Sequence, residues 1–244
     1  MIKQVPGKIY LADQRGTVES SLFRRQSTFN FGAFQSEHKE PFGRLYGLNE
    51  ETLAGGHTVE FEVAQDSYVV LLPITGGVEF STGGGASGTA EVEQIINLAV
   101  PAGTTLRLRN PFAGELVSLL HLWLQAPPLP APATALTTVF GQLLEEQENE
   151  LLELLSFAAV PGQAAAFTQA LPFALRLGRF MGRQETVYKV QPGNKLFAFI
   201  IAGAFELEGR LMHEKDGVAL WDVDEIEVEA LSNHALLLVV ELAA

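Results

Sequence analysis

The clearest pattern of apolar and polar positions lies between Leu53 and Phe80. Residues 57–63 alternate strictly, so that the odd-numbered residues share one face and Thr58, Glu60 and Glu62 share the other. A period of two predicts a strand. Residues 68–74 form a nearly continuous apolar run with branched side chains, which predicts a strand buried on both faces. Gly76–Gly77 then predicts a corner that leads into a third strand.

Strand patterns continue along the chain, and only one stretch favours a helix. Residues 104–110 alternate again, and residues 116–125 form an apolar strand. Over 138–157, spaced leucines and a run of glutamates predict an amphipathic helix as far as about Glu150. Beyond it, the pattern is equally compatible with a strand that Pro161–Gly162 would end.

An internal repeat indicates two similar domains. Residues 201–207 repeat the apolar-x-Gly-x-apolar-Glu-apolar pattern of residues 74–80, with Gly203 in the place of Gly76. Many short strands with glycine turns predict an all-β fold, and the repeat predicts two β-barrels in tandem. We expect an N-terminal barrel over 1–126, a Pro-rich linker with a short helix over 127–149, and a C-terminal barrel over 150–244.

Charge and composition narrow the class of protein. The chain of 244 residues has a net charge of −13 and no cysteine. The negative charge repels the phosphates of nucleic acids and of anionic membranes, so we expect no direct binding to either. The absence of cysteine excludes disulfides and thiolate-bound metals. The sequence shows no signal-peptide core and no apolar run long enough to span a bilayer, so we expect a cytoplasmic protein.

Residues 15–51 carry a family signature. The segment resembles the N-terminal signature of the pirin family of bicupins, which includes bacterial quercetin dioxygenase-like proteins. The matching residues are Arg15, Gly16, Thr28, Phe29, Phe31, His38, Phe42, Gly43, Leu45, Asn49 and Glu50. The resemblance continues more faintly through Leu119–Leu124 and 187–242. It implies two cupin barrels of jelly-roll type, with 150–182 forming mostly strands of the second barrel rather than a longer helix.

The resemblance also implies a metal site, but the ligands are missing. In the family, three histidines and a glutamate hold a transition metal, usually iron, in the first barrel. Aligned on Gly76, the first histidine pair falls on Glu62 and Ala64. The third histidine falls on Leu108, or on Leu106 if the frame shifts by two residues, and the glutamate falls on Asn110. The second barrel has no histidine at the corresponding positions, Lys189 and Gln191.

We therefore expect no metal cofactor and weigh three functions. The first is a metal-free module whose barrel mouth binds a small apolar molecule. Its expected lining is Glu60, Glu62, Ala64, Tyr68, Leu106, Leu108 and His121. The barrel can equally be filled by its own side chains. The second is a quercetinase-type dioxygenase with iron or another divalent metal on a non-standard set of Glu62, His57 and His121. The third, implied by the family's link to transcription, is a module that binds a protein partner.

Overall fold

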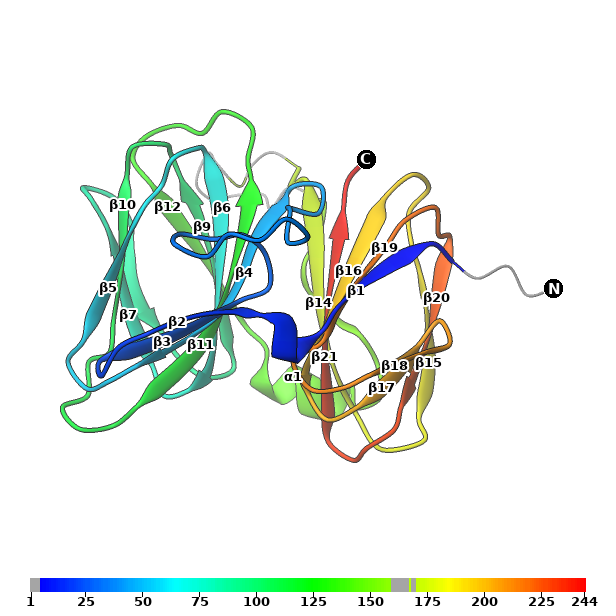
Figure 1. Ribbon diagram of the computed structural model, residues 1–244. Helices are drawn as coiled ribbons and strands as arrows, with labels where there is room; N and C mark the ends of the chain where they lie inside the picture. Colours follow the sequence, from blue (N-terminus) through cyan, green and yellow to red (C-terminus); the bar gives the residue numbers. More distant parts are fainter. Residues whose placement is uncertain (1–4, 159–166, 168–169) are drawn as a thin grey trace. The chain divides into compact units, whose positions relative to one another are not determined.

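The computed structural model describes residues 5–158, 167 and 170–244, and it is built almost entirely from antiparallel strands (Figure 1). The described residues contain one short α-helix, α1 (Gly141–Glu146), and a 3-10 turn at Ala12–Gln14. The chain divides into two compact units. Each unit consists of a larger and a smaller sheet. The predicted all-β fold with two barrels is confirmed.

The first barrel comprises Gly16–Phe140 together with Ala158, Phe167 and Ala170. Its seven-stranded sheet has the order β12-β9-β6-β11-β4-β3-β2, and its four-stranded sheet has the order β5-β10-β7-β8. The strands are β2 (Gly16–Glu19), β3 (Phe23–Ser27), β4 (Leu45–Leu53), β5 (Thr58–Glu62), β6 (Ser67–Thr75), β7 (Val78–Thr82), β8 (Ser87–Ala90), β9 (Gln94–Val100), β10 (Thr105–Arg109), β11 (Val117–Gln125) and β12 (Thr134–Val139).

The second barrel comprises residues 5–15, Gly141–Phe157 and Leu171–Ala244. Its sheets have the orders β1-β19-β16-β21-β14-β13 and β15-β20-β17-β18. The strands are β1 (Gly7–Tyr10), β13 (Leu152–Leu155), β14 (Phe173–Phe180), β15 (Glu185–Lys189), β16 (Lys195–Ala202), β17 (Phe205–Leu207), β18 (Arg210–Met212), β19 (Gly217–Leu220), β20 (Glu225–Ala230) and β21 (Ala235–Leu242).

Two segments join a different barrel from the one that their place in the sequence suggested. β1 pairs with β19 from Gly7 to Tyr10, so the N-terminal strand completes the second barrel instead of opening the first. β12 pairs with β9 and belongs to the first barrel, although 127–149 was expected to be a linker with a helix. β12 is an edge strand with half-exposed side chains, so its sequence lacks the apolar face that reveals an inner strand.

The segment after β12 holds a short helix followed by a strand. α1 ends at Glu146, well before Glu150. Asn149 has a left-handed backbone with φ of 71°, and its side chain accepts a hydrogen bond from the backbone N–H of Met181. This turn ends the helical path and directs the chain into β13, as the family resemblance implied for residues after 150. The turn proposed at Pro161–Gly162 lies outside the described residues.

The repeated glycines occupy equivalent corners in the two barrels. Gly76 and Gly203 both have positive φ angles, 68° and 81°, in the region that favours glycine. A Cβ atom at Gly203 would lie 2.4 Å from Ser232 Oγ, and one at Gly76 would lie 2.7 Å from Val117 Cγ1. Both backbone conformation and space therefore require glycine at these corners. This explains why the repeat is detectable where the rest of the two sequences has diverged.

Alternation along the strands decides which side chains fill the first barrel. Val59, Phe61, Leu106 and Leu108 are buried in its apolar core, which also contains Val69 and Leu71 of β6. This part of the interior is thus filled by the barrel's own apolar side chains. No helix in the part of the chain that the structure describes is long and apolar enough to cross a membrane.

Candidate functional site

The first barrel has a cavity of roughly 370 Å³ at its mouth, which we call the mouth cavity. Its apolar walls are the rings of Phe31, Tyr46, Phe61 and Trp123, and Arg25 also borders it. The remaining lining residues are Asn30, Gly32, Glu60, Glu62, Ala64 and Gln65. The size is in the range of small-molecule sites, which combine apolar walls with a few polar groups.

The aromatic walls pack against each other as well as facing the cavity. The ring centroids of Phe31 and Trp123 are 5.4 Å apart, and those of Phe61 and Trp123 are 5.5 Å apart. Tyr46 lies beside Trp123 and is fixed at its hydroxyl by a 2.7 Å hydrogen bond with Ser67 Oγ. These contacts hold the rings in place, so the cavity is largely preformed.

Beside these rings lies a buried ion pair. Arg25 of β3 donates from Nε to Glu51 Oε2 at 2.5 Å and from Nη2 to Glu51 Oε1 at 3.3 Å. The guanidinium carbon lies 4.6 Å from the centroid of Phe61, a cation–π contact. The Glu51 side chain is fully buried, and 13% of the Arg25 side chain is exposed. A cation and its carboxylate therefore replace apolar packing on this wall of the barrel.

His121 joins this pair to the aromatic wall. Trp123 Nε1 donates to His121 Nδ1 at 2.7 Å, and His121 Nε2 lies 3.3 Å from Glu51 Oε2. Because Nδ1 accepts the indole hydrogen, the imidazole is neutral and carries its hydrogen on Nε2, which it donates to Glu51. Burial lowers the pKa of His121 despite the opposing effect of the Glu51 hydrogen bond. The side chain acts as a neutral bridge between Trp123 and Glu51.

This environment predicts that the protein loses stability in mild acid. The folded-state pKa of His121 lies below the ordinary 6.5, so below pH 6.5 the unfolded state binds a proton that the folded state does not. Unfolding free energy should therefore fall as pH drops below 6.5, at up to about 1.4 kcal/mol per pH unit for this one group. Denaturant unfolding at several pH values measures the slope. An equal slope in His121→Gln would contradict the assignment.

The structure separates the predicted lining residues other than His121 into three groups. Glu60, Glu62 and Ala64 are exposed and line the mouth cavity, because the even-numbered positions of β5 face outward while Val59 and Phe61 face the core. Leu106 and Leu108 are fully buried in that core and do not border the cavity. Tyr68 is buried on the other face of β6 from Val69 and Leu71, and its ring packs near Phe167.

The two histidines of the alternative ligand set have other contacts. His121 lies behind the cavity wall and uses both ring nitrogens, as described above. His57 stacks on Phe23, with ring centroids 5.9 Å apart and planes inclined by 7°. His57 has the same parity as the core-facing Val59 and Phe61 of β5, so it lies on the opposite face from Glu62.

These donors do not fit the metal that the family resemblance implies. A transition metal requires several convergent histidine or carboxylate ligands with their own supporting hydrogen bonds. Glu62 is at the exposed rim, while both nitrogens of His121 are engaged by protein groups. Residues 5–158, 167 and 170–244 contain no cluster of three or more His, Cys, Asp or Glu side chains suited to a metal ion. Asn110, at the expected glutamate position, instead bonds the backbone oxygens of Leu53 and Glu115.

Sequence reasoning missed the Arg25–Glu51 pair. The two residues are 26 positions apart on neighbouring strands, directly opposite in the β3–β4 register. One signal was available in the sequence. Glu51 has the same parity as Leu53 on β4, so its carboxylate points inward, and a buried carboxylate requires a partner. The sequence alone did not say which of the nearby arginines would provide it.

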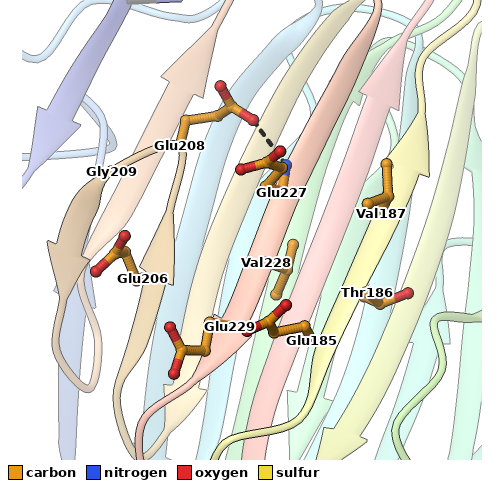
Figure 2. A pocket seen from close by; sticks show the side chains of 9 residues that line it. All are labelled: Glu185, Thr186, Val187, Glu206, Glu208, Gly209, Glu227, Val228 and Glu229. Carbon is orange, nitrogen blue, oxygen red and sulfur yellow. Dashed lines mark hydrogen bonds between the residues drawn. The ribbon is translucent and has the colours of Figure 1, made fainter.

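The second barrel has a different hollow, lined by five glutamates on the four-stranded sheet (Figure 2). Glu185, Glu229 and Glu206 lie directly opposite one another across β15, β20 and β17. Glu229 is 3.4 Å from Arg183, and Glu208 accepts a hydrogen bond from the backbone N–H of Glu227. The row of three carboxylates makes this face strongly negative.

Relief of this repulsion should stabilise the protein. Like charges directly opposite on neighbouring strands are unfavourable, so Glu206→Lys should raise the unfolding free energy by up to about 1 kcal/mol at low salt. Glu225→Lys is the matched control, because Glu225 faces Lys189 and the change places two cations opposite each other. Thermal unfolding at low and high salt tests both. Destabilisation by Glu206→Lys would contradict the repulsion argument.

Comparisons with known proteins agree with this architecture. Residues 172–242 match the family model of the quercetinase C-terminal cupin domain. A Pseudomonas aeruginosa protein named "Putative quercetin 2,3-dioxygenase" is 21% identical over 238 residues, covering 93% of this chain and 96% of that protein. Two cupin barrels in one chain define a bicupin. The C-terminal barrel matches the quercetinase C-terminal cupin family, and the chain as a whole is similar to pirin and quercetinase-type bicupins.

Solved structures share the fold over nearly the whole chain. YhhW from Escherichia coli has a TM-score of 0.82 at 17% identity, with 97% of each chain covered. The same bacterial pirin in complex with nickel(II) has a TM-score of 0.81 at 17% identity, covering 98% of this chain and 99% of that one. Quercetin 2,3-dioxygenase from Acinetobacter baumannii has a TM-score of 0.74 at 14% identity, with coverages of 100% and 88%. These likenesses establish the fold.

Proposed function

We propose that the chain is a metal-free bicupin whose first barrel binds a small, planar, hydroxylated aromatic molecule in the mouth cavity. The observation that carries this proposal is the set of four aromatic rings that line the cavity together with Arg25, whose guanidinium lies over the ring of Phe61. Offset or edge-to-face contact with such rings favours a flat aromatic ligand. The preformed walls reduce the entropy that binding must offset.

The polar groups of the cavity favour an uncharged ligand with hydroxyl groups. The charge of Arg25 is already balanced by Glu51, and Glu60 forms a 2.7 Å ion pair with Arg107. Arg25 Nη1 lies on the Gly32 side, 3.9 Å from the place of a Cβ at that glycine, and can donate to a ligand oxygen. Glu62, for which no ion pair occurs among the described residues, can accept from a hydroxyl at the rim.

Quercetin is a suitable first probe because it is a planar polyphenol and two relatives are named for it. Isothermal calorimetry should show saturable binding to the wild-type protein. Phe31→Leu should weaken the affinity by about tenfold through loss of ring contact. Phe112→Leu is the control, because Phe112 is a partly exposed phenylalanine of the same barrel that does not line the cavity.

Two results would overturn this proposal. One is no saturable binding of quercetin or of smaller hydroxylated aromatics. The other is stoichiometric iron, nickel, manganese or copper in protein purified without chelator, if Glu62→Ala abolishes it. The second result would favour a dioxygenase with a non-standard ligand set instead.

A further inference from the structure

A row of polar side chains crosses the inside of the first barrel behind the mouth cavity. In the strand register, Asn49 of β4 lies directly opposite Ser27 of β3 on one side and His121 of β11 on the other. Directly opposite residues on antiparallel strands project to the same face of the sheet. Asn49 and His121 are fully buried, and Ser27 is 1% exposed. We call Ser27 and Asn49 the inner polar row.

The inner polar row has unused hydrogen-bonding capacity. Ser27 Oγ and both polar atoms of the Asn49 carboxamide are buried and have no hydrogen-bond partner among the described residues. His121 cannot serve them, because its nitrogens are engaged by Trp123 and Glu51. The next residue across the sheet from His121 is the apolar Leu71. Buried polar atoms in native proteins are almost always hydrogen-bonded. Three unpaired atoms close together therefore indicate a bound molecule, which we call the guest, that forms hydrogen bonds with them.

The chemistry of the row restricts that guest to an uncharged group. The carboxamide offers both a donor and an acceptor, and so does the serine hydroxyl. Neighbouring charges are already balanced, since Glu51 is paired with Arg25 and His121 is neutral. An anion or cation would therefore enter a buried site with no free counter-charge, at a high desolvation cost. A hydroxyl group, which both donates and accepts, matches the row.

The position of the row connects it to the mouth cavity. Along the strands it is flanked on one side by Gly47 and Trp123 and on the other by Arg25 and Glu51. Trp123 and Arg25 both line the cavity. The inner polar row therefore lies directly behind two residues that border the cavity.

We propose that the inner polar row is a deeper subsite that binds a hydroxyl group of the aromatic ligand through Asn49 and Ser27. This inference rests on the proposed function of the mouth cavity. It assigns the buried end of the ligand to a phenolic hydroxyl, while the ligand rings lie against the cavity-facing sides of Phe31, Phe61 and Trp123.

The first experiment compares matched variants with quercetin by calorimetry. Asn49→Leu and Ser27→Ala should each weaken binding by about tenfold or more. Asn97→Leu is the control, because Asn97 is also fully buried with an unpaired carboxamide but alternates with the core-facing Ile96 and Leu98. Its affinity should remain within about twofold of wild type, a difference well under 1.4 kcal/mol. Equal affinities in wild type, Asn49→Leu and Ser27→Ala would overturn the inference even though the mouth cavity binds.

A second experiment needs no variant and separates the two proposals. In ¹⁵N-labelled wild-type protein, phenol should shift the side-chain amide resonances of Asn49, and toluene, which lacks the hydroxyl, should not. If quercetin fails to bind but phenol shifts Asn49, the mouth-cavity proposal fails and the inner subsite stands. If neither phenol nor quercetin affects Asn49, the row holds a structural water only and the inference is overturned.

Discussion

Replacement of Glu51 by alanine should destabilise the protein by about 3 to 5 kcal/mol, because it leaves the Arg25 cation buried without its carboxylate. The Glu51 side chain is fully buried and receives two hydrogen bonds from Arg25 and one from His121. Water can replace little of this, since only 13% of the Arg25 side chain is exposed. Urea unfolding of wild type and Glu51→Ala measures the difference.

Two controls identify burial of the charge as the cause. Glu60 forms a similarly short ion pair with Arg107 in the same barrel, but about half of each side chain is exposed (56% and 47%). Glu60→Ala should therefore cost less than about 1 kcal/mol. The double replacement Arg25→Met with Glu51→Leu should recover most of the loss, because no unpaired charge remains. A double variant as unstable as Glu51→Ala would show that the loss of stability comes from altered packing and not from the unpaired charge.

Much of the fold could be predicted from the local pattern of apolar and polar residues. Strict alternation located β5, and the continuous apolar run located β6. The repeated glycine corners predicted the second barrel, because Gly76 and Gly203 have a backbone conformation and surroundings that exclude a side chain. Edge strands were harder to predict from the sequence. β1 and β12 are short and only partly buried, so their pairing partners leave no mark in their own sequences.

Only part of the candidate site could be predicted from the sequence, because the direction in which a strand's side chains face depends on pairing with distant strands. The alternation of β5 defined two faces correctly but not which one meets the core. The Phe61 face packs inward against Leu106 of β10, which leaves Glu60 and Glu62 at the cavity rim. The Arg25–Glu51–His121 network joins three strands, with Glu51 and His121 70 positions apart. Apart from the inward position of Glu51, a single sequence carries no signal for this network.

The second barrel also contains a buried glutamate, which it stabilises by different means. Glu241 of β21 is 1% exposed and accepts hydrogen bonds from Asn194 Nδ2 at 2.7 Å, from the backbone N–H of Gln191 at 2.9 Å and from the Tyr188 hydroxyl. Burial, followed by the hydrogen bond with Glu241, raises the pKa of Tyr188. The phenol therefore remains a donor at neutral pH. Arg176 donates to the Tyr188 oxygen at 2.5 Å and is itself paired with Glu153.

Glu241→Leu should accordingly cost about 3 to 5 kcal/mol, because three hydrogen bonds to a charged acceptor are lost and buried donors remain unpaired. Glu241→Gln keeps one acceptor oxygen and allows the Tyr188 hydroxyl to accept, so a loss of about 1 to 2 kcal/mol is expected. Glu153→Ala is the surface control, since 45% of the Glu153 side chain is exposed, and should cost less than about 1 kcal/mol. Denaturant unfolding of the three variants gives the ranking. If Glu241→Leu were no less stable than Glu153→Ala, the network around Glu241 would contribute packing alone, and the second barrel would not depend on its buried charge.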